Sequence, residues 1–174
     1  LVLGKPLGIG VLSAALKKGI LDDHGYAQMV GVTTQLNRVG RTLATLPGVH
    51  AMTDVTGFGL AGHAWNIARN SKVALEIDFS ALPSHPGFFD LTAAGITTGA
   101  TGANRRHLAP HVRWLSARTE VEQALVFDPQ TSGGLLLAVP EASVDPILSA
   151  LTATGHRAAE IGEVVAGDPE LRIL

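Results

Sequence analysis

The order of hydrophobic and polar residues along the chain predicts helices and strands in mixed order. Apolar residues three or four positions apart predict helices, whereas apolar runs and strict alternation predict strands. Helical spacing covers residues 9–18, 25–46, 60–70, 88–91, 119–127 and 141–154. Strand patterns cover residues 1–3, 50–53, 73–79, 135–139, 157–165 and 170–174. Residues 95–105 carry three glycines and three threonines, so we expect a loop there.

The longest predicted helix, residues 25–46, has an apolar stripe at steps of three or four residues. The stripe consists of Met29, Val32, Leu36, Val39, Leu43 and Leu46. A partner helix could sit on such a stripe, but we favour the simpler interpretation that it faces the core.

No regular strand–helix–strand rhythm runs through the chain, which disfavours a parallel sheet wound with helices on both faces. We therefore expect an α+β fold in which several helices pack against one mixed β-sheet. The length of 174 residues fits a single domain over residues 1–174.

Composition narrows the class of protein. Hydrophobic residues make up 46% of the chain, enough for a packed core. No apolar run reaches the roughly 18 residues of a membrane span, and a net charge of -2 gives no broad attraction to nucleic acid or anionic membranes. We expect neither as a partner. The chain has no cysteine, which excludes disulfides, thiolate metal sites and a cysteine nucleophile within it and fits a reducing cytosol.

A glycine motif with two interpretations follows the strand at residues 50–53. Gly57, Gly59 and Gly62 have the spacing of a dinucleotide-binding turn, and Glu76 lies about where a ribose-binding acid belongs. Against this interpretation, the polar residues 53–56 separate the glycines from the apolar strand. An oxidoreductase that binds a nucleotide cofactor therefore stays an alternative rather than the favoured hypothesis.

Asp54 gives the same segment a second meaning. An aspartate at the end of a strand, flanked by Thr53 and Thr56, offers the hard oxygen ligands that Mg²⁺ prefers. Gly57 and Gly59 would let the backbone approach a phosphate, because N–H groups that open a helix face anions. Asp54 could instead only cap that helix, and the two roles are compatible.

The remaining candidate groups carry less chemistry. The motif DPQTSGG, residues 128–134, predicts a turn before a strand, and Ser132 lacks the surroundings of a hydrolytic nucleophile. His107 and His111 are four residues apart but lack the adjacent glutamate of a zinc motif. For His63 we favour a packed or capping role.

Three segments in order along the chain, residues 4–19, 52–68 and 128–139, resemble the selenophosphate synthetase (selenide, water dikinase) family. Gly4 and Ala61 depart from the residues expected there, threonine and leucine. The resemblance implies synthesis of selenophosphate from selenide, ATP and water, with release of AMP and phosphate. It also implies a fold like the C-terminal domain of aminoimidazole ribonucleotide synthetase. In that family an N-terminal domain carries the catalytic cysteine or selenocysteine and lysine, most ATP contacts, two metal-binding aspartates and the main dimer interface.

This chain resembles only the second domain, so the resemblance implies a C-terminal half that needs its N-terminal domain. Asp54 would be its one Mg²⁺ ligand, and no catalytic residue is carried over. Groups at the edge of the ATP site would be Thr53, Thr56, Gly57 and Gly59, and, on weaker grounds, Lys5, Asn104 and residues 131–134. The enzyme would be a cytoplasmic homodimer, and this half alone would be inactive. A non-catalytic docking module is the third hypothesis.

Overall fold

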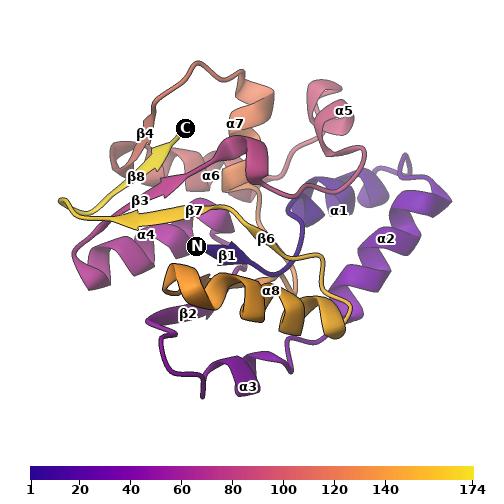
Figure 1. The fold of residues 1–174 in the computed structure, drawn as a ribbon. Coiled ribbons are helices and arrows are strands. Elements are labelled where there is room, and N and C mark those ends of the chain that lie inside the picture. The colour runs from indigo at the N-terminus through magenta and orange to yellow at the C-terminus, as the bar shows by residue number, and fades with distance from the viewer.

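The computed structural model describes all residues, 1–174, and has the predicted α+β fold (Figure 1). The strands are β1 Val2–Leu3, β2 Ala51–Asp54, β3 Ala74–Ile77, β4 Val112–Trp114, β5 Leu135–Ala138, β6 Ala159–Glu160, β7 Gly162–Val165 and β8 Glu170–Ile173. The α-helices are α1 Ile9–Lys17, α2 Asp23–Thr34, α3 Gly40–Leu43, α4 Gly59–Ser71, α5 Phe88–Ala93, α6 Gly99–Leu108, α7 Glu120–Phe127 and α8 Val144–Ala153. Short 3-10 helices cover Phe79–Ala81, Ala109–His111 and Glu141–Ser143.

The strands form two sheets rather than the single sheet expected. The first has the order β2-β5-β1-β6 and is antiparallel throughout. The second has the order β4-β8-β3-β7 and is mixed, with β8 parallel to both neighbours and β3 antiparallel to β7. The chain passes from one sheet to the other between β6 and β7. Gly162 makes this passage possible, because a Cβ there would lie 2.0 Å from the carbonyl oxygen of Glu76.

Strand β5 is a central strand of the first sheet and is buried along its whole length, which explains why it is apolar at every position. Leu135 and Leu137 point to the side covered by α3 and α8, whereas Leu136 and Ala138 point into the larger core. Figure 1 shows α8 lying alongside β1 and β6. The sheet thereby holds the carboxyl end of β2 in a fixed place.

The prediction of one helix over residues 25–46 was wrong. The chain leaves helical geometry between Thr34 and Gly40. The ammonium group of Lys5 donates to the carbonyl oxygens of Val32 and Gln35 at 3.2 and 2.6 Å. These bonds come from a distant residue and satisfy carbonyls at the end of α2. The predicted core stripe is correspondingly broken: Val39 and Leu43 are buried, but Leu36 is 58% exposed and Leu46 39%.

The predicted loop at 95–105 is also wrong, because most of it forms α6. The hydroxyl of Thr98 accepts a hydrogen bond from Thr101 N at 3.0 Å and so caps the helix. The buried positions of α6 are Thr101, Asn104 and Leu108. Hydrophobic periodicity did not indicate this helix because two of its three buried side chains are polar. None of the helices combines the length and apolar character that a membrane-spanning helix needs.

Candidate functional site

Asp54 is the last residue of β2, an edge strand of the first sheet, and its side chain is exposed. Its backbone pairs with Leu135, and Thr53 Oγ1 donates to its carbonyl oxygen at 3.1 Å, while its carboxylate is left free. The interpretation of Asp54 as a helix cap is wrong, because α4 has Phe58 at its N-cap position and no side-chain cap. A free carboxylate at the end of a strand is suited to binding a cation.

The loop after Asp54 lies directly against the DPQTSGG motif, so the two motifs form one structural unit. Val55 N donates to the carbonyl oxygen of Gly134 at 2.9 Å, and Gln130 N donates to the carbonyl oxygen of Thr56 at 3.0 Å. The two segments lie so close that a Cβ on Gly133 would be 2.1 Å from the carbonyl oxygen of Val55. The glycine at 133 therefore serves close packing of backbone on backbone.

His63 fastens the same loop from α4. Its Nε2 accepts a hydrogen bond from Thr56 N at 3.0 Å and lies 3.1 Å from Thr56 Oγ1. Burial lowers the pKa of His63, while the carboxylate of Asp54 acts in the opposite direction. An unprotonated Nε2 is what the bond from the backbone N–H requires. His63 therefore holds the loop before α4, while α4 itself has no side-chain cap.

The first half of DPQTSGG caps a helix from a distance. Helix α1 begins after Gly8 and has no side-chain cap of its own. Asp128 Oδ2 accepts from Gly10 N at 2.9 Å, and Gln130 Oε1 accepts from Gly8 N and Ile9 N, both at 3.3 Å. Burial raises the pKa of Asp128 to about 7, although the N–H groups of α1 oppose this rise. The sequence held one clue, namely a helix start between two glycines with no Ser, Thr, Asp or Asn to cap it.

Two residues considered for the site edge are buried structural groups instead. Lys5 is 1% exposed, and its ammonium group donates to three carbonyl oxygens, including that of Ser132 at 2.7 Å. Burial lowers the pKa of Lys5. Asn104 is 6% exposed and donates from Nδ2 to the carbonyl oxygens of Gly57 and Phe127 at 2.9 and 3.0 Å. Neither side chain is available to a ligand at the surface.

The other candidates differ in how accessible they are. Gly57 is exposed, and Thr53 and Thr56 are half-buried. Gly59 is buried, and a Cβ there would lie 2.9 Å from the carbonyl oxygen of Val126. In residues 131–134, Thr131 is exposed, Ser132 is half-buried, and both glycines are buried.

The topology contradicts the dinucleotide-binding interpretation. That fold needs a parallel sheet with the glycine turn following one of its strands. Here the strand before the glycines, β2, is an edge strand whose one neighbour, β5, is antiparallel to it. Gly62 also packs inside the protein, since a Cβ there would lie 2.4 Å from Cβ of Phe58. Gly59 and Gly62 therefore serve close packing in this fold.

Asp54 fits a metal site as one ligand among several. No group of three or more His, Asp or Glu side chains in the chain could hold a metal ion. Mg²⁺ in protein sites keeps waters and is held by one or two carboxylates together with substrate phosphates. The exposed, unpaired carboxylate of Asp54 meets one such requirement. The His111 ring stacks on Trp65 with centroids 3.9 Å apart, and neither His107 nor His111 belongs to a group of three possible metal ligands.

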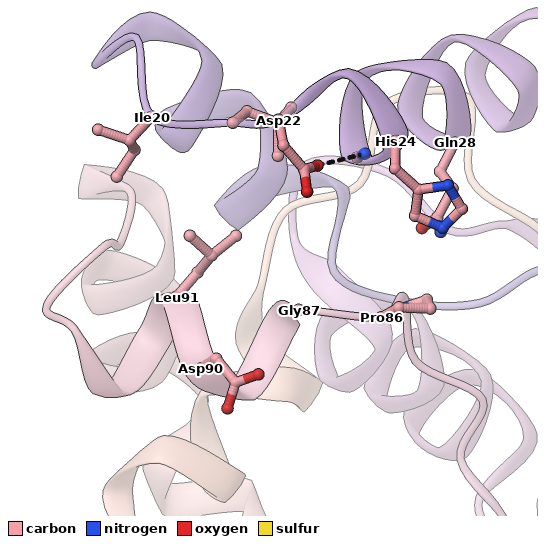
Figure 2. Close-up of a pocket in the computed structure, with 10 residues that line it drawn as sticks. Ile20, Asp22, His24, Gln28, Pro86, Gly87, Asp90 and Leu91 are labelled. Carbon is pink, nitrogen blue, oxygen red and sulfur yellow. Dashed lines mark hydrogen bonds between the residues drawn. The ribbon is translucent and has the colours of Figure 1, made fainter.

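A separate cleft of about 290 Å³ lies between α2 and α5 and includes neither Asp54 nor residues 55–58 after it (Figure 2). Asp22, His24 and Gln28 each make a hydrogen bond within α2, whereas Asp90 lines the cleft from α5 and Gln28 Oε1 has no partner. Asp22 caps this helix by accepting from Gly25 N at 2.7 Å, and the side chains of His24 and Gln28 lie 2.6 Å apart. We therefore assign this cleft no role in the candidate site.

Comparison with known proteins confirms the resemblance. A selenide, water dikinase of Burkholderia orbicola (strain MC0-3) is 54% identical over 168 residues, which are 96% of this chain and 48% of the relative. The selenide, water dikinase of Pseudomonas straminea is 50% identical over 172 residues, 98% of this chain and 48% of the relative. The chain thus spans about half the length of these curated relatives.

A solved structure shares the fold at lower identity. Thiamine-monophosphate kinase from Stenotrophomonas maltophilia K279a matches 99% of this chain and 48% of its own chain, with a TM-score of 0.65 and 16% identity. The family described as AIR synthase related protein, C-terminal domain, matches residues 1–173. On this match, the chain belongs to the family of AIR synthase related proteins as a C-terminal domain.

Proposed function

We propose that this chain is the C-terminal domain of a two-domain selenophosphate synthetase and supplies one Mg²⁺ ligand, Asp54, to a site shared with the N-terminal domain. The observation that carries the proposal is the free, exposed carboxylate of Asp54 at the end of β2. The names of the relatives at 54% and 50% identity support the activity, and their length supports a second domain. The substrates would be selenide, ATP and water.

Phosphoryl transfer depends mainly on positioning and charge neutralisation, so a site of carboxylates around Mg²⁺ is suited to it. When bound, the metal would neutralise charge on the phosphates of ATP. Asp54 would hold it together with carboxylates of the other domain, because one carboxylate cannot complete such a site. Thr53, Thr56 and Gly57 would form the edge near the phosphates, whereas the buried Gly59 is packed against Val126 and would not.

The same proposal includes a homodimer in the cytoplasm and an isolated chain without activity. The purified 174 residues should release no AMP from ATP in the presence of selenide. Robust turnover by this chain alone would show that the N-terminal domain is not essential and would overturn that part of the proposal.

The decisive variant is Asp54→Asn in the two-domain enzyme, assayed by selenide-dependent AMP release. Asparagine keeps the size of the side chain but removes its charge, so we expect activity to fall by about two orders of magnitude or more. Asp168→Asn is the matched control, because Asp168 is an exposed aspartate in the turn between β7 and β8. If Asp54→Asn folds normally and keeps near-normal turnover, Asp54 is not a metal ligand.

A further inference from the structure

Residues 55–58, which we call the Asp54 loop, are held at consecutive backbone groups by distant parts of the chain. On one side, Gly134 and Gln130 of DPQTSGG bond to Val55 N and the Thr56 carbonyl oxygen. On the other side, Asn104 of α6 donates to the carbonyl oxygen of Gly57 at 2.9 Å. Such bonds fix the direction in which the chain leaves Asp54.

We infer that Asn104 is a positioning residue for the metal site and acts through the Asp54 loop. The inference rests on the proposed function of Asp54. Asn104 touches no substrate, since its side chain is 6% exposed. Its amide group donates one hydrogen bond to the carbonyl oxygen of Gly57 in the Asp54 loop. It donates another to the carbonyl oxygen of Phe127, the residue before DPQTSGG. One side chain thereby ties the two motifs together.

Helix α6, which carries Asn104, is fixed by its N-terminal cap and by two neighbouring helices. Helix α6 is capped by Thr98 and packs against both α4 and α7. Helix α4 follows the Asp54 loop, and α7 leads into DPQTSGG. By bonding to both segments, Asn104 therefore links the elements on the two sides of the Asp54 loop.

Mg²⁺ makes small displacements costly, because it demands near-ideal octahedral geometry with ligands at about 2.0–2.1 Å. A carboxylate that must meet a metal held partly by another domain has little tolerance for error. Groups that orient a metal ligand from behind typically contribute about 10–100-fold to metal affinity or activity. Asn104 is placed to make such a contribution.

A residue that only stabilised the fold would lower stability without changing the requirement for metal. The test is therefore the free-metal requirement of the two-domain enzyme at saturating ATP, measured both as half-maximal Mn²⁺ binding by electron paramagnetic resonance and as half-maximal Mg²⁺-dependent AMP release. Asn104→Ala and Asn104→Asp leave the carbonyl oxygens of Gly57 and Phe127 without a donor. Both variants should raise the metal requirement about tenfold or more. Asn104→Ser keeps one hydroxyl donor and should fall between these variants and the unmodified enzyme. His107→Ala, on the exposed side of α6, is the control and should leave it unchanged.

Asp54→Asn separates failure of this inference from failure of the proposed function. If Asn104 acts through Asp54, Asn104→Ala should cause no further rise in the Mg²⁺ requirement when Asp54 is already asparagine. An unchanged requirement in Asp54→Asn alone would overturn the proposed function. A raised requirement in Asp54→Asn with none in folded Asn104 variants would overturn only the positioning role. If even Asn104→Ser fails to fold, Asn104 is a core residue and the inference is wrong.

Discussion

His85 is a buried histidine with no hydrogen-bond partner on either ring nitrogen, and its replacement by leucine should stabilise the protein. The residue precedes α5, is 2% exposed and has its backbone N–H bonded to the carbonyl oxygen of Leu7. A buried polar group without a partner costs about 1–3 kcal/mol. Leucine keeps much of the volume and removes the unpaired nitrogens, so we expect His85→Leu to raise the free energy of unfolding at pH 7 by roughly 1–2 kcal/mol.

The advantage of leucine should grow in acid. Burial, assisted by the nearby charge of Arg157, lowers the pKa of His85 from 6.5 to about 4. The unfolded chain therefore binds a proton at a higher pH than the folded chain does. The free energy of unfolding is therefore unaffected by this titration above pH 6.5 and falls as the pH drops from 6.5 toward 4, by roughly 3 kcal/mol in all.

The assay is urea unfolding of the unmodified chain and His85→Leu at pH 7 and pH 4.5. The difference in unfolding free energy between them should be larger at pH 4.5 by about 2–3 kcal/mol. His107→Leu is the control, because it makes the same substitution at an exposed position of α6. If His85→Leu is less stable than the unmodified chain at pH 7, the unpaired nitrogens of His85 are not costly. If the difference in unfolding free energy does not change with pH, the pKa of His85 is not lowered by folding.

Three further predictions concern buried or capping groups. The pKa of Asp128, raised to about 7, means that its contribution to stability declines as the pH rises from 3.8 to 7. Between pH 5 and pH 8 the unmodified chain should therefore lose roughly 2–3 kcal/mol more than Asp128→Asn in denaturant titrations, and parallel curves would count against a raised pKa. Lys5→Met leaves the carbonyl oxygens of Val32, Gln35 and Ser132 without their shared donor, so chemical unfolding should show a loss of at least about 2 kcal/mol; a loss well below that would mean the bonds contribute little. Thr119→Ala removes the capping box with Glu122 and should lower the free energy of unfolding by about 1 kcal/mol, whereas Thr119→Ser keeps the hydroxyl and should not. Equal melting temperatures of the two variants would show that the cap does not stabilise α7.

Sequence reasoning worked where burial is apolar and local. The strand β5 and the helix α4 were predicted from hydrophobic spacing, and the capping box that begins α7 from the spacing of Thr119 and Glu122. It failed at the end of α2, because the competing donor is Lys5, far away in the sequence. It failed at α6 as well, because a helix whose buried face includes Asn104 has no hydrophobic signal.

The sequence predicted the local features of the candidate site but not its contacts between distant segments. Asp54 at a strand end, with glycines after it, was visible in the sequence. The contact between its loop and DPQTSGG was not, because hydrogen bonds such as that from Gln130 N to Thr56 join segments far apart in the chain. These bonds change the meaning of the second motif, from an open turn to the support of the first.

We propose above that the carboxylate of Asp54 binds a metal ion together with ligands from a second domain. The most direct test is a crystal structure of the two-domain enzyme with Mn²⁺ in place of Mg²⁺ and a non-hydrolysable ATP analogue, with the metal located by its anomalous scattering. We expect a metal ion about 2.1 Å from an Asp54 carboxylate oxygen, with its other ligands from the N-terminal domain and the phosphates. A fully coordinated metal site with Asp54 turned away from it would show that Asp54 is not a metal ligand.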